Sequence, residues 1–251
     1  MPYTNISFAN LKTLLRARLQ NSLFYTDIEI AEFLNECFSL LQIGSLYWKS
    51  RFQAQSVAGL VFYDLSSLAG TLDDNGNPQI LMPLRVAFNQ SPLDFCAISD
   101  LDNGGISNWQ TQTTATAGAP DVPQLWGTVG LNFLYLWPSD AVGGNDIQLD
   151  CAVRAPHFAT DGSDDALKVN IESGMIPAML DYCQHIAQIK RGAGQIAATM
   201  PKLKSFFRLI AQTNSMFAAS SIFKESYALQ TERKARTRGD ITGVPTPARF
   251  R

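Results

Sequence analysis

Two histidines are the residues of this chain best placed for catalysis, because histidine titrates near neutral pH. His157 follows Pro156 at the end of an expected strand, and no acid or nucleophile forms a recognisable motif with it. His185 lies on an expected helix, beside an apolar stripe. Both patterns are typical of packed or solvated histidines, so we expect neither to act as a general acid or base.

Three aspartates, Asp161, Asp164 and Asp165, could in principle bind calcium. A calcium loop needs oxygen ligands at alternating positions, a central glycine and a closing bidentate glutamate. Here Gly162 comes too early, and no glutamate follows at the required offset. We therefore interpret residues 161–165 as a solvated linker and expect no metal site.

The four cysteines, Cys37, Cys96, Cys151 and Cys183, lie far apart and among apolar residues. No C-x-x-C motif occurs, which argues against a zinc site. A free cysteine behaves as a small hydrophobic residue, so we expect buried, reduced thiols and synthesis in a cytosol.

Two glycine-rich stretches do not form phosphate loops. The one at 192–194 lacks the Lys-Ser/Thr that would hold a phosphate and its magnesium, and the one at 143–144 suits a turn. Hydrolase, metalloprotease and kinase signatures are absent from the sequence. We expect a chain that is not an enzyme and binds no cofactor. A hydrolase that uses His157 or the three aspartates stays open as a third class.

Four aromatic residues, Trp109, Trp126, Tyr135 and Trp137, could stack on bases or sugars. Phe133, Tyr135 and Trp137 alternate along an expected strand and so share one face of a sheet. A packed face is the usual reason for such a pattern, and we favour core or interface over a binding platform.

The 251 residues, of which 46% are hydrophobic, suffice for one large domain or two small ones. The net charge of −2 argues against a chain that coats nucleic acid. Residues 121–181 hold nine acids and two bases, a charge of −7, whereas residues 224–251 hold seven bases and three acids, a charge of +4. Opposite charges on separate segments favour self-association or an oriented partner.

The first residues lack the basic and apolar regions of a secretory signal, and no stretch approaches 18 uninterrupted apolar residues. We expect a soluble protein with no membrane partner.

The N-terminal segment, residues 1–50, predicts a helical hairpin. Ser7 can cap a first helix whose apolar face holds Phe8, Leu11, Leu14, Leu15 and Leu19. Thr26 and Glu29 form a capping box for a second helix. The apolar face of that helix holds Ile30, Phe33, Leu34, Cys37, Phe38 and Leu41.

Residues 51–160 predict a β-rich domain. Segments 52–57 and 60–65 flank Ala58-Gly59 and predict a β-hairpin with a tight turn. Further strands are expected at 80–88, 124–126, 131–137 and 147–153, and a loop at 111–119. Together they predict one antiparallel sheet or a small sandwich inserted between the helical ends.

Residues 161–230 predict helices that complete the helical domain. The first carries Ile176, Met179, Leu180, Cys183, Ile186 and Ala187 on one face, with Pro177 in its first turn. The second is expected to begin near Pro201 and to carry Leu203, Phe206, Phe207, Ile210 and Phe217. Residues 231–251 read as an extended basic arm, disordered in the free subunit. The fold class is therefore α+β, with helical hairpins from both chain ends packed together.

The order of short motifs resembles one known family. TDIEIAEFLN (26–35) is followed by VAGLVFYDL (57–65), GAP (118–120) and LYLWPSD (134–140), and then by a strand at 147–156 and the helix opening at 176–177. This layout resembles the head-to-tail adaptor, or neck, proteins of short-tailed bacteriophages, which are tail tubular protein A-like. The polar insert at 103–119 departs from the pattern of that family.

The resemblance implies a virion protein at the head–tail junction, made in the host bacterial cytoplasm. It implies a ring of identical subunits, commonly a dodecamer, beneath the portal, through which genomic DNA passes during ejection without sequence-specific binding. The helices would meet the portal, and the β part would face the tail nozzle and fibres. By position, residues 226–251 would be the portal-binding arm, with contacts from Arg233, Lys234, Arg236, Arg238, Arg249, Phe250 and Arg251. The alternative is a carbohydrate- or receptor-binding virion protein that uses Trp109, Trp126 and Trp137.

Overall fold

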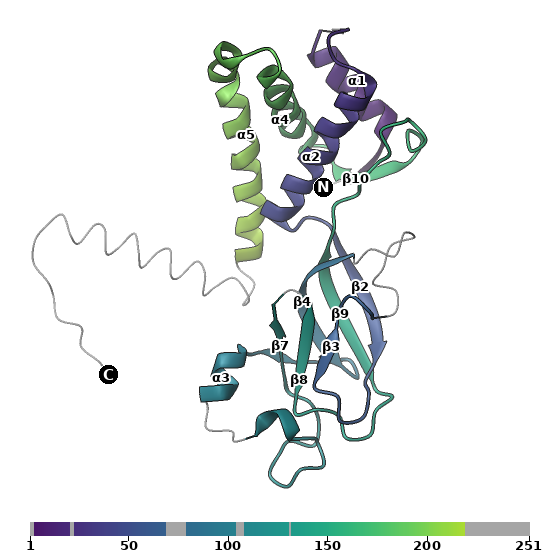
Figure 1. Cartoon of the computed structure of the whole chain (residues 1–251), viewed down its shortest axis with the longest axis vertical. Coiled ribbons are helices and arrows are strands. Elements are labelled where there is room, and N and C mark those ends of the chain that lie inside the picture. The colour runs from purple at the N-terminus through teal and green to yellow at the C-terminus, as the bar shows by residue number, and fades with distance from the viewer. Residues whose placement is uncertain (1–2, 21–22, 69–78, 104–107, 131, 219–251) are drawn as a thin grey trace, which may run out of the picture.

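The structure is a computed structural model that describes residues 3–20, 23–68, 79–103, 108–130 and 132–218. It mixes helices and sheets in an α+β arrangement. The long helices, which come from both ends of the described chain, gather at one end of an elongated molecule (Figure 1). The strands between residues 49 and 153 gather at the other end.

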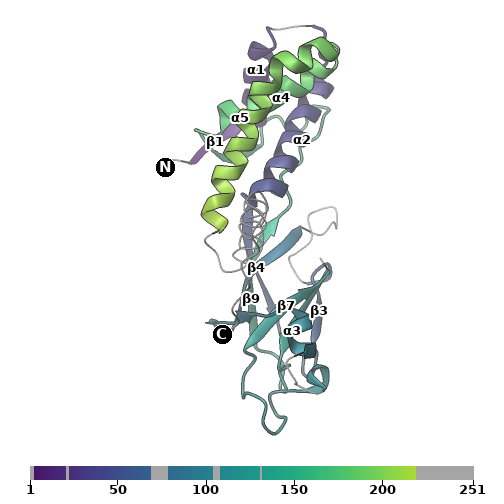
Figure 2. The same ribbon diagram turned by 90° about the vertical axis from the view of Figure 1, so that its left-hand side faces the viewer.

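Four helices enclose one hydrophobic core, which we call the helical core. They are α1 (Phe8–Arg18), α2 (Asp27–Ser45), α4 (Ile176–Ile189) and α5 (Ala193–Ala218). Helix α5 packs on both α4 and α2 (Figure 2). Both predicted helix starts are confirmed. The Asn10 N–H donates to Ser7 Oγ over 3.3 Å, and the Thr26 N–H donates to Glu29 Oε2 over 2.9 Å while Thr26 Oγ1 accepts from the Glu29 N–H.

Two predicted core residues face solvent instead, Leu14 at 42% and Phe207 at 47% exposure. The predicted start of the last helix near Pro201 is also wrong, because α5 begins at Ala193 and contains this proline. Pro201 lies on the exposed side of α5, so the loss of its N–H leaves the buried face of the helix intact.

A two-stranded sheet within the helical domain was not predicted. β1 (Tyr3–Ser7) pairs antiparallel with β10 (Lys168–Glu172), from Tyr3 opposite Glu172 to Ser7 opposite Lys168. It brings the start of the described chain against the segment that leads into α4. Ser7 ends β1 and also caps α1, so one residue fixes both elements.

The remaining strands form two four-stranded sheets that share a second core, the sandwich core. The first sheet has the order β2 (Lys49–Gln55), β9 (Asp146–Val153), β4 (Ile80–Phe88), β5 (Ser91–Pro92). The second has the order β3 (Phe62–Asp64), β8 (Phe133–Trp137), β7 (Leu125–Val129), β6 (Asp94–Phe95). The pairing is not wholly antiparallel as expected, since β6 runs parallel to β7.

The second sheet is covered on its outer side as well. The short helix α3 (Ile98–Asn103) and a 3-10 turn (Trp109–Thr111) contribute Leu101 and Trp109 to a small third cluster with Val61 and Tyr135. Part of the polar insert at 103–119 is therefore structured. Alternate residues of β8 serve two cores, because Leu134 and Leu136 face the sandwich core and Tyr135 faces the outer cluster.

The predicted hairpin at 52–65 is wrong, although its turn exists. The Leu60 N–H donates to the Val57 carbonyl over 3.0 Å, and Gly59 has a φ of 70°. However, β2 pairs with β9 and β3 pairs with β8, so the two strands belong to different sheets. The turn carries the chain across the edge of the sandwich, which lets Phe52 and Tyr63 reach the same core from opposite sides.

Two buried amides of α2 hold the connections between the domains. Gln42 Nε2 donates to the carbonyls of Trp48 (2.9 Å) and Val153 (2.5 Å), and Gln42 Oε1 accepts from the Trp48 N–H (2.7 Å). Asn35 exchanges two hydrogen bonds with the backbone of Phe158, at 2.8 and 3.0 Å. Phe158, expected in the β-rich domain, lies in the helical core, with its ring stacked 4.5 Å from that of Phe8.

Candidate interaction surfaces

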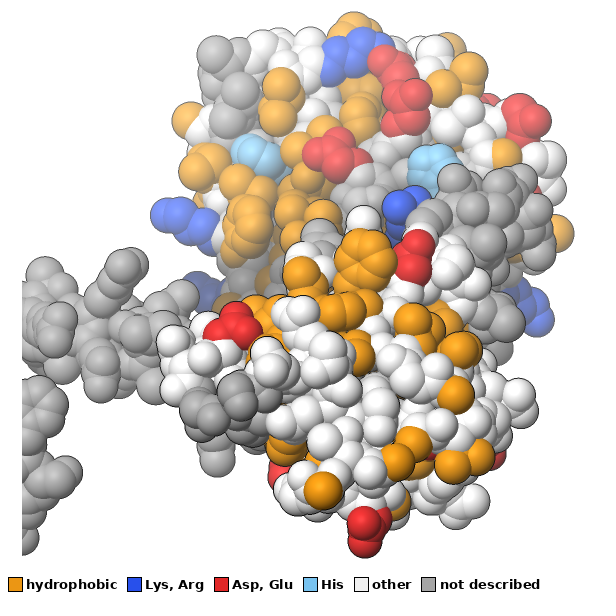
Figure 3. All heavy atoms as spheres, turned by 60° about the horizontal axis from the view of Figure 1, so that its bottom comes forward, with side chains coloured by type: hydrophobic (Ala, Val, Ile, Leu, Met, Phe, Trp, Pro, Cys, Tyr) orange, Lys and Arg blue, Asp and Glu red, His pale blue; other side chains and the backbone are white. Residues whose placement is uncertain are grey.

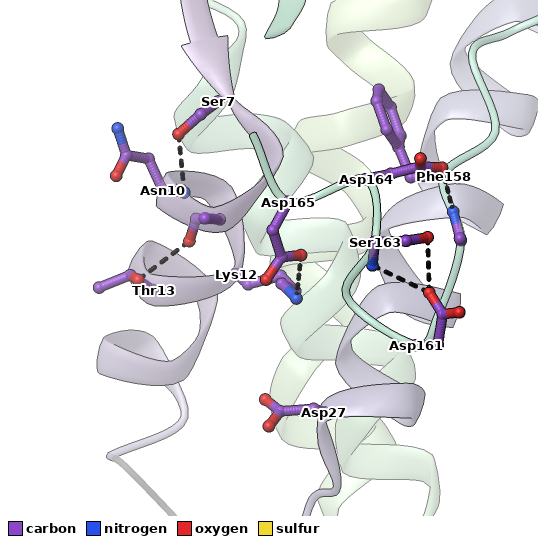
Figure 4. A network of polar contacts seen from close by, with 12 residues as sticks. Ser7, Asn10, Lys12, Thr13, Asp27, Phe158, Asp161, Ser163, Asp164 and Asp165 are labelled. Atoms are coloured by element: carbon purple, nitrogen blue, oxygen red, sulfur yellow. Dashed lines mark hydrogen bonds and ion pairs between the residues drawn. The ribbon is translucent and has the colours of Figure 1, made fainter. Parts of the chain in front are cut away.

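Of the three aspartates considered for calcium, Asp161 and Asp164 make hydrogen bonds within a loop, and Asp165 ties this loop to α1 (Figure 4). Asp161 accepts hydrogen bonds from the Ser163 N–H (2.9 Å) and hydroxyl (2.7 Å), which hold the pKa of Asp161 below its usual value. Asp164 accepts from the Ala159 N–H at 2.6 Å, and Asp165 forms an ion pair with Lys12. The segment is thus a hydrogen-bonded loop rather than a solvated linker. Within the described ranges, His, Cys, Asp and Glu form no group of three that could hold a metal ion.

The two histidines occupy different environments. His185 is buried, and its Nδ1 lies 2.8 Å from Thr199 Oγ1, so it links α4 to α5. His157 is exposed on the connection between the domains. His157 lies outside the helices and strands, and the observed contact of His185 is a hydrogen bond that joins two helices.

The cysteines are free, as expected, and Cys37, Cys151 and Cys183 are buried. Cys96 differs from the prediction because it is only partly buried. Burial raises the pKa of Cys37 and raises that of Cys151 to about 12, which keeps both thiols protonated at neutral pH.

The aromatic residues considered as stacking platforms are mostly interior. Trp109, Trp126 and Tyr135 are at most 3% exposed. Trp109 Nε1 donates to Asp102 Oδ1 over 2.7 Å, and the Tyr135 hydroxyl donates to the Cys96 carbonyl over 2.5 Å. Trp137 is partly buried. The face expected to be packed is packed only in part, because Tyr135 is buried and Trp137 is partly buried but Phe133 is 43% exposed. Trp109 and Trp126 cannot offer a ring face to a sugar without local unfolding.

The predicted arm lies outside the described residues. This applies to Arg233, Lys234, Arg236, Arg238, Arg249, Phe250 and Arg251. The portal-binding role of these residues stays a prediction.

The β domain has an unusual charge distribution. From residue 86 to residue 153 the sequence contains seven aspartates and no lysine or arginine. The β-domain end nearest to the viewer in Figure 3 accordingly shows acidic, apolar and uncharged polar groups and no basic ones. An anionic polymer such as DNA finds no neutralising groups on this stretch of the chain.

Buried Asp140 organises the loops at this end. It is 3% exposed and accepts hydrogen bonds from Ser56 Oγ (2.5 Å), Asn145 Nδ2 (2.7 Å) and the Val142 N–H (3.0 Å). Burial by itself would raise the pKa of Asp140, but these donors outweigh it and hold the pKa below 3.8. Gly143 packs so closely that a Cβ there would lie 2.7 Å from the Ala58 nitrogen. The loops at 56–60 and 139–145 therefore form one fixed unit.

The helical domain carries its charges in segregated sets. Helix α1 has three bases and no acid, α2 has four acids and no base, and α5 has three bases and no acid. The bases of α1 are all paired, Lys12 with Asp165, Arg16 with Asp27 and Arg18 with Asp181.

The outer charges of α2 and α5 differ from those of α1. Glu32 of α2 and Lys204 and Arg208 of α5 are exposed, and none of them has an ion-pair partner among the described residues.

A polar pocket of about 260 Å³ lies where α1, α4 and α5 meet. It is lined by Arg18, Leu19, Gln20, Gln184, Gln188, Arg191 and Thr199. Gln188 is 8% exposed, and its Oε1 has no hydrogen-bond partner. Arg18 already donates to Asp181 of α4. Gln184 of α4 donates to the Arg18 carbonyl and accepts from Lys202 of α5. Few groups of the pocket are therefore free to bind a ligand.

The sequence matches no protein-family model and no curated protein at a significant level. Among the described helices, none is long and apolar enough to cross a membrane.

Proposed function

We propose that this chain is a structural adaptor subunit of a short-tailed bacteriophage. Twelve copies form a ring beneath the portal and join it to the tail nozzle or fibres, and genomic DNA passes through the ring. The helical domain contacts the portal, aided by the basic arm at 231–251, and the β domain contacts the tail.

The observation that carries the proposal is the two-ended build of the subunit (Figure 1). A connector needs two separate faces held at a fixed distance. Here the helical core and the sandwich core are separate. Where the chain passes between them, the Gln42 side chain makes three hydrogen bonds with the backbone of Trp48 and Val153. The two ends therefore present different chemistry on one subunit.

The charge of the β domain supports the same function. DNA passing a ring slides best along a wall without lysine and arginine, because such groups would bind phosphates. Residues 86–153 meet this condition. A ring in which these residues face outward, away from the channel, would contradict this part of the proposal.

The alternative, a carbohydrate- or receptor-binding protein, has less support. Two of the three tryptophans on which it depended, Trp109 and Trp126, lie in hydrophobic clusters.

Electron cryomicroscopy of the phage particle that carries this chain tests the proposal. We expect a ring of density at the head–tail junction that fits the elongated subunit with its helices toward the capsid. Particles made with a chain lacking 231–251 should lose this density, while the purified truncated chain keeps its circular dichroism spectrum. Density for the chain in the capsid shell or at a fibre tip would refute the adaptor function.

A further inference from the structure

Two exposed stripes on the helical domain have matching chemistry. The α2 stripe consists of Ile28, Glu32, Glu36, Ser39 and Ile43, and the α5 stripe consists of Met200, Lys204, Phe207, Arg208 and Ala211. Residues three or four apart share one face of a helix, so each set forms a continuous surface. The apolar members are far more exposed than core residues, with Ile43 at 70% and Phe207 at 47%.

Each stripe carries two charges of the same sign, four residues apart. Glu32 and Glu36 are one turn apart on α2, and Lys204 and Arg208 are one turn apart on α5. Like charges at this spacing destabilise a helix, so both stripes weaken the isolated subunit. The Tyr182 hydroxyl donates to Glu36 at 2.8 Å, whereas the other three charged groups have no described hydrogen-bond or ion-pair partner.

The two stripes fit each other. Four residues of helix span about 6 Å, so the two acids and the two bases are spaced equally along their axes. Two helices laid side by side can therefore form both opposite-charge pairs at once. The apolar residues that flank the charges, such as Ile43 and Phe207, would be buried in the same contact.

We propose that the α2 stripe of one copy binds the α5 stripe of the next copy. The inference rests on the proposed ring function and names the surfaces that build the ring. Figure 2 shows α5 on the near side of the helical domain and α2 farther back on its right, so the two stripes belong to two different helices of one subunit. A contact between two different surfaces of identical subunits is head-to-tail, and it closes into a ring when the rotation between neighbours allows.

Charge selects a second copy over the other available occupant. Residues 224–251 of the same chain carry a charge of +4, so they could cover the acidic α2 stripe but would be repelled by the α5 stripe. Of these two occupants, only another helical domain supplies a complementary partner for both stripes.

The test compares self-association of the full chain by sedimentation velocity at low salt. Glu32→Lys and Lys204→Glu should each raise the concentration at which assemblies larger than dimers form by about tenfold. In the proposed contact Glu32 faces Lys204 and Glu36 faces Arg208. The double variant, and a 1:1 mixture of the two single variants, should therefore restore assembly, because positions 32 and 204 again carry opposite charges in every contact. Asp121→Lys and Lys168→Glu, at exposed positions outside the stripes, are the matched controls and should change nothing.

The remaining outcomes overturn the proposal. These are no association of the wild-type chain, single variants that assemble normally, and a mixture that stops at dimers. If Glu32→Lys weakens assembly and Lys204→Glu does not, the basic C-terminal segment covers α2 instead. Thermal melting of each variant separates loss of contact from loss of fold, and Lys204→Gln gives a milder second variant. The adaptor function depends on where the chain lies in the particle, so rings at another location would refute that function and leave this contact standing.

Discussion

The two domains are stabilised in different ways. The helical domain joins both ends of the described chain, and its ion pairs Arg18–Asp181 and Lys190–Glu29 each connect residues more than 150 positions apart. The β domain is continuous in sequence, from β2 to β9, and its distal loops are held by hydrogen bonds to a single buried aspartate, Asp140. The helical surface thus carries segregated acids and bases, whereas residues 49–153 of the β domain hold ten aspartates and three bases, Lys49, Arg51 and Arg85.

This difference has a consequence for folding and for assembly. The helical core cannot close until α4 and α5 have been synthesised, whereas the sandwich core needs only the middle of the chain. Surface charge that could direct a contact between subunits is concentrated on the domain that closes last. Incomplete chains would therefore lack the surfaces that we propose for ring assembly.

The largest effect on stability should come from replacing Phe206, which is buried, and the exposed neighbouring residue Phe207 of α5 serves as its control. Phe206 is fully buried beside Tyr182, with ring centroids 4.6 Å apart, and Phe207 is 47% exposed. Phe206→Ala should lower the free energy of unfolding of the helical domain by about 3–5 kcal/mol through the cavity that it leaves. Phe207→Ala should change it by less than about 0.5 kcal/mol. Denaturant unfolding followed by far-UV circular dichroism measures both.

Near-UV circular dichroism then tests whether the two cores are independent. Trp109 and Trp126 lie in the β domain and report its packing once Trp48, which packs on the helical core, is replaced by Phe in both proteins compared. In Phe206→Ala the near-UV transition should stay at its wild-type denaturant concentration. A shift equal to that of the helical signal would mean that the two domains unfold as one unit and are not stabilised separately.

The next largest loss of stability should come from replacing Asp140 in the β domain. Asp140→Asn replaces a carboxylate that accepts three hydrogen bonds and should cost about 2–3 kcal/mol. The folded-state pKa of Asp140 lies below 3.8, so the ionised form stabilises the fold. This contribution is present above pH 3.8 and is lost as the pH falls through the folded-state pKa. The stability difference between wild type and variant should therefore shrink on acidification.

Unfolding is measured from about pH 6 to about pH 2.5, a range that spans the ordinary pKa of a carboxyl group. The result checks the sign of the pH dependence. Asp121→Asn, at an exposed aspartate, is the control and should follow the wild type. A gap that widens toward acid would show that Asp140 is protonated in the folded protein.

The junction should give a smaller effect, because neutral groups are involved. Gln42→Ala leaves the Trp48 N–H and the Val153 carbonyl without their side-chain partner and should cost about 1–2 kcal/mol. Hydrogen exchange at the Trp48 amide should become faster while exchange within β9 stays slow. Gln53→Ala on the exposed side of β2 should change neither. Unaltered exchange at Trp48 would mean that Gln42 does not hold the junction.

Local signals in the sequence predicted local structure. The Ser7 cap and the Thr26–Glu29 box depend on residues three apart and are seen as predicted. The turn at Gly59 was also predicted, but its strands were assigned to each other. A turn fixes only how the chain reverses, whereas the partners of β2 and β3 are β9 and β8, which lie far along the chain.

The missed features depend on distant contacts. Strands β1 and β10 are five residues each and pair across some 160 positions, so neither shows a pattern of its own. Asn35 and Gln42, which hold the domain connections, did leave a signal. They are polar residues seven apart on the buried side of α2, and a buried amide on an apolar face requires a partner. The sequence could have marked them as important but could not name Phe158 or Val153 as their partners.

The smallest expected effect on stability comes from neutralising one charge of a stripe. It is also the sharpest test of the stripes, because the stability of the monomer should rise while self-association weakens. Glu32→Gln removes one of two like charges on α2 and should raise the free energy of unfolding of the monomer by about 0.2–0.5 kcal/mol. Lys204→Gln should do the same on α5 by relieving Arg208. Both should weaken self-association, since each removes half of an opposite-charge pair between copies. A residue kept only for the fold would lower stability when changed, and Lys168→Gln, outside both stripes, should move neither quantity. If Glu32→Gln destabilises the monomer instead, Glu32 stabilises its own subunit, and the repulsion argument for the α2 stripe fails.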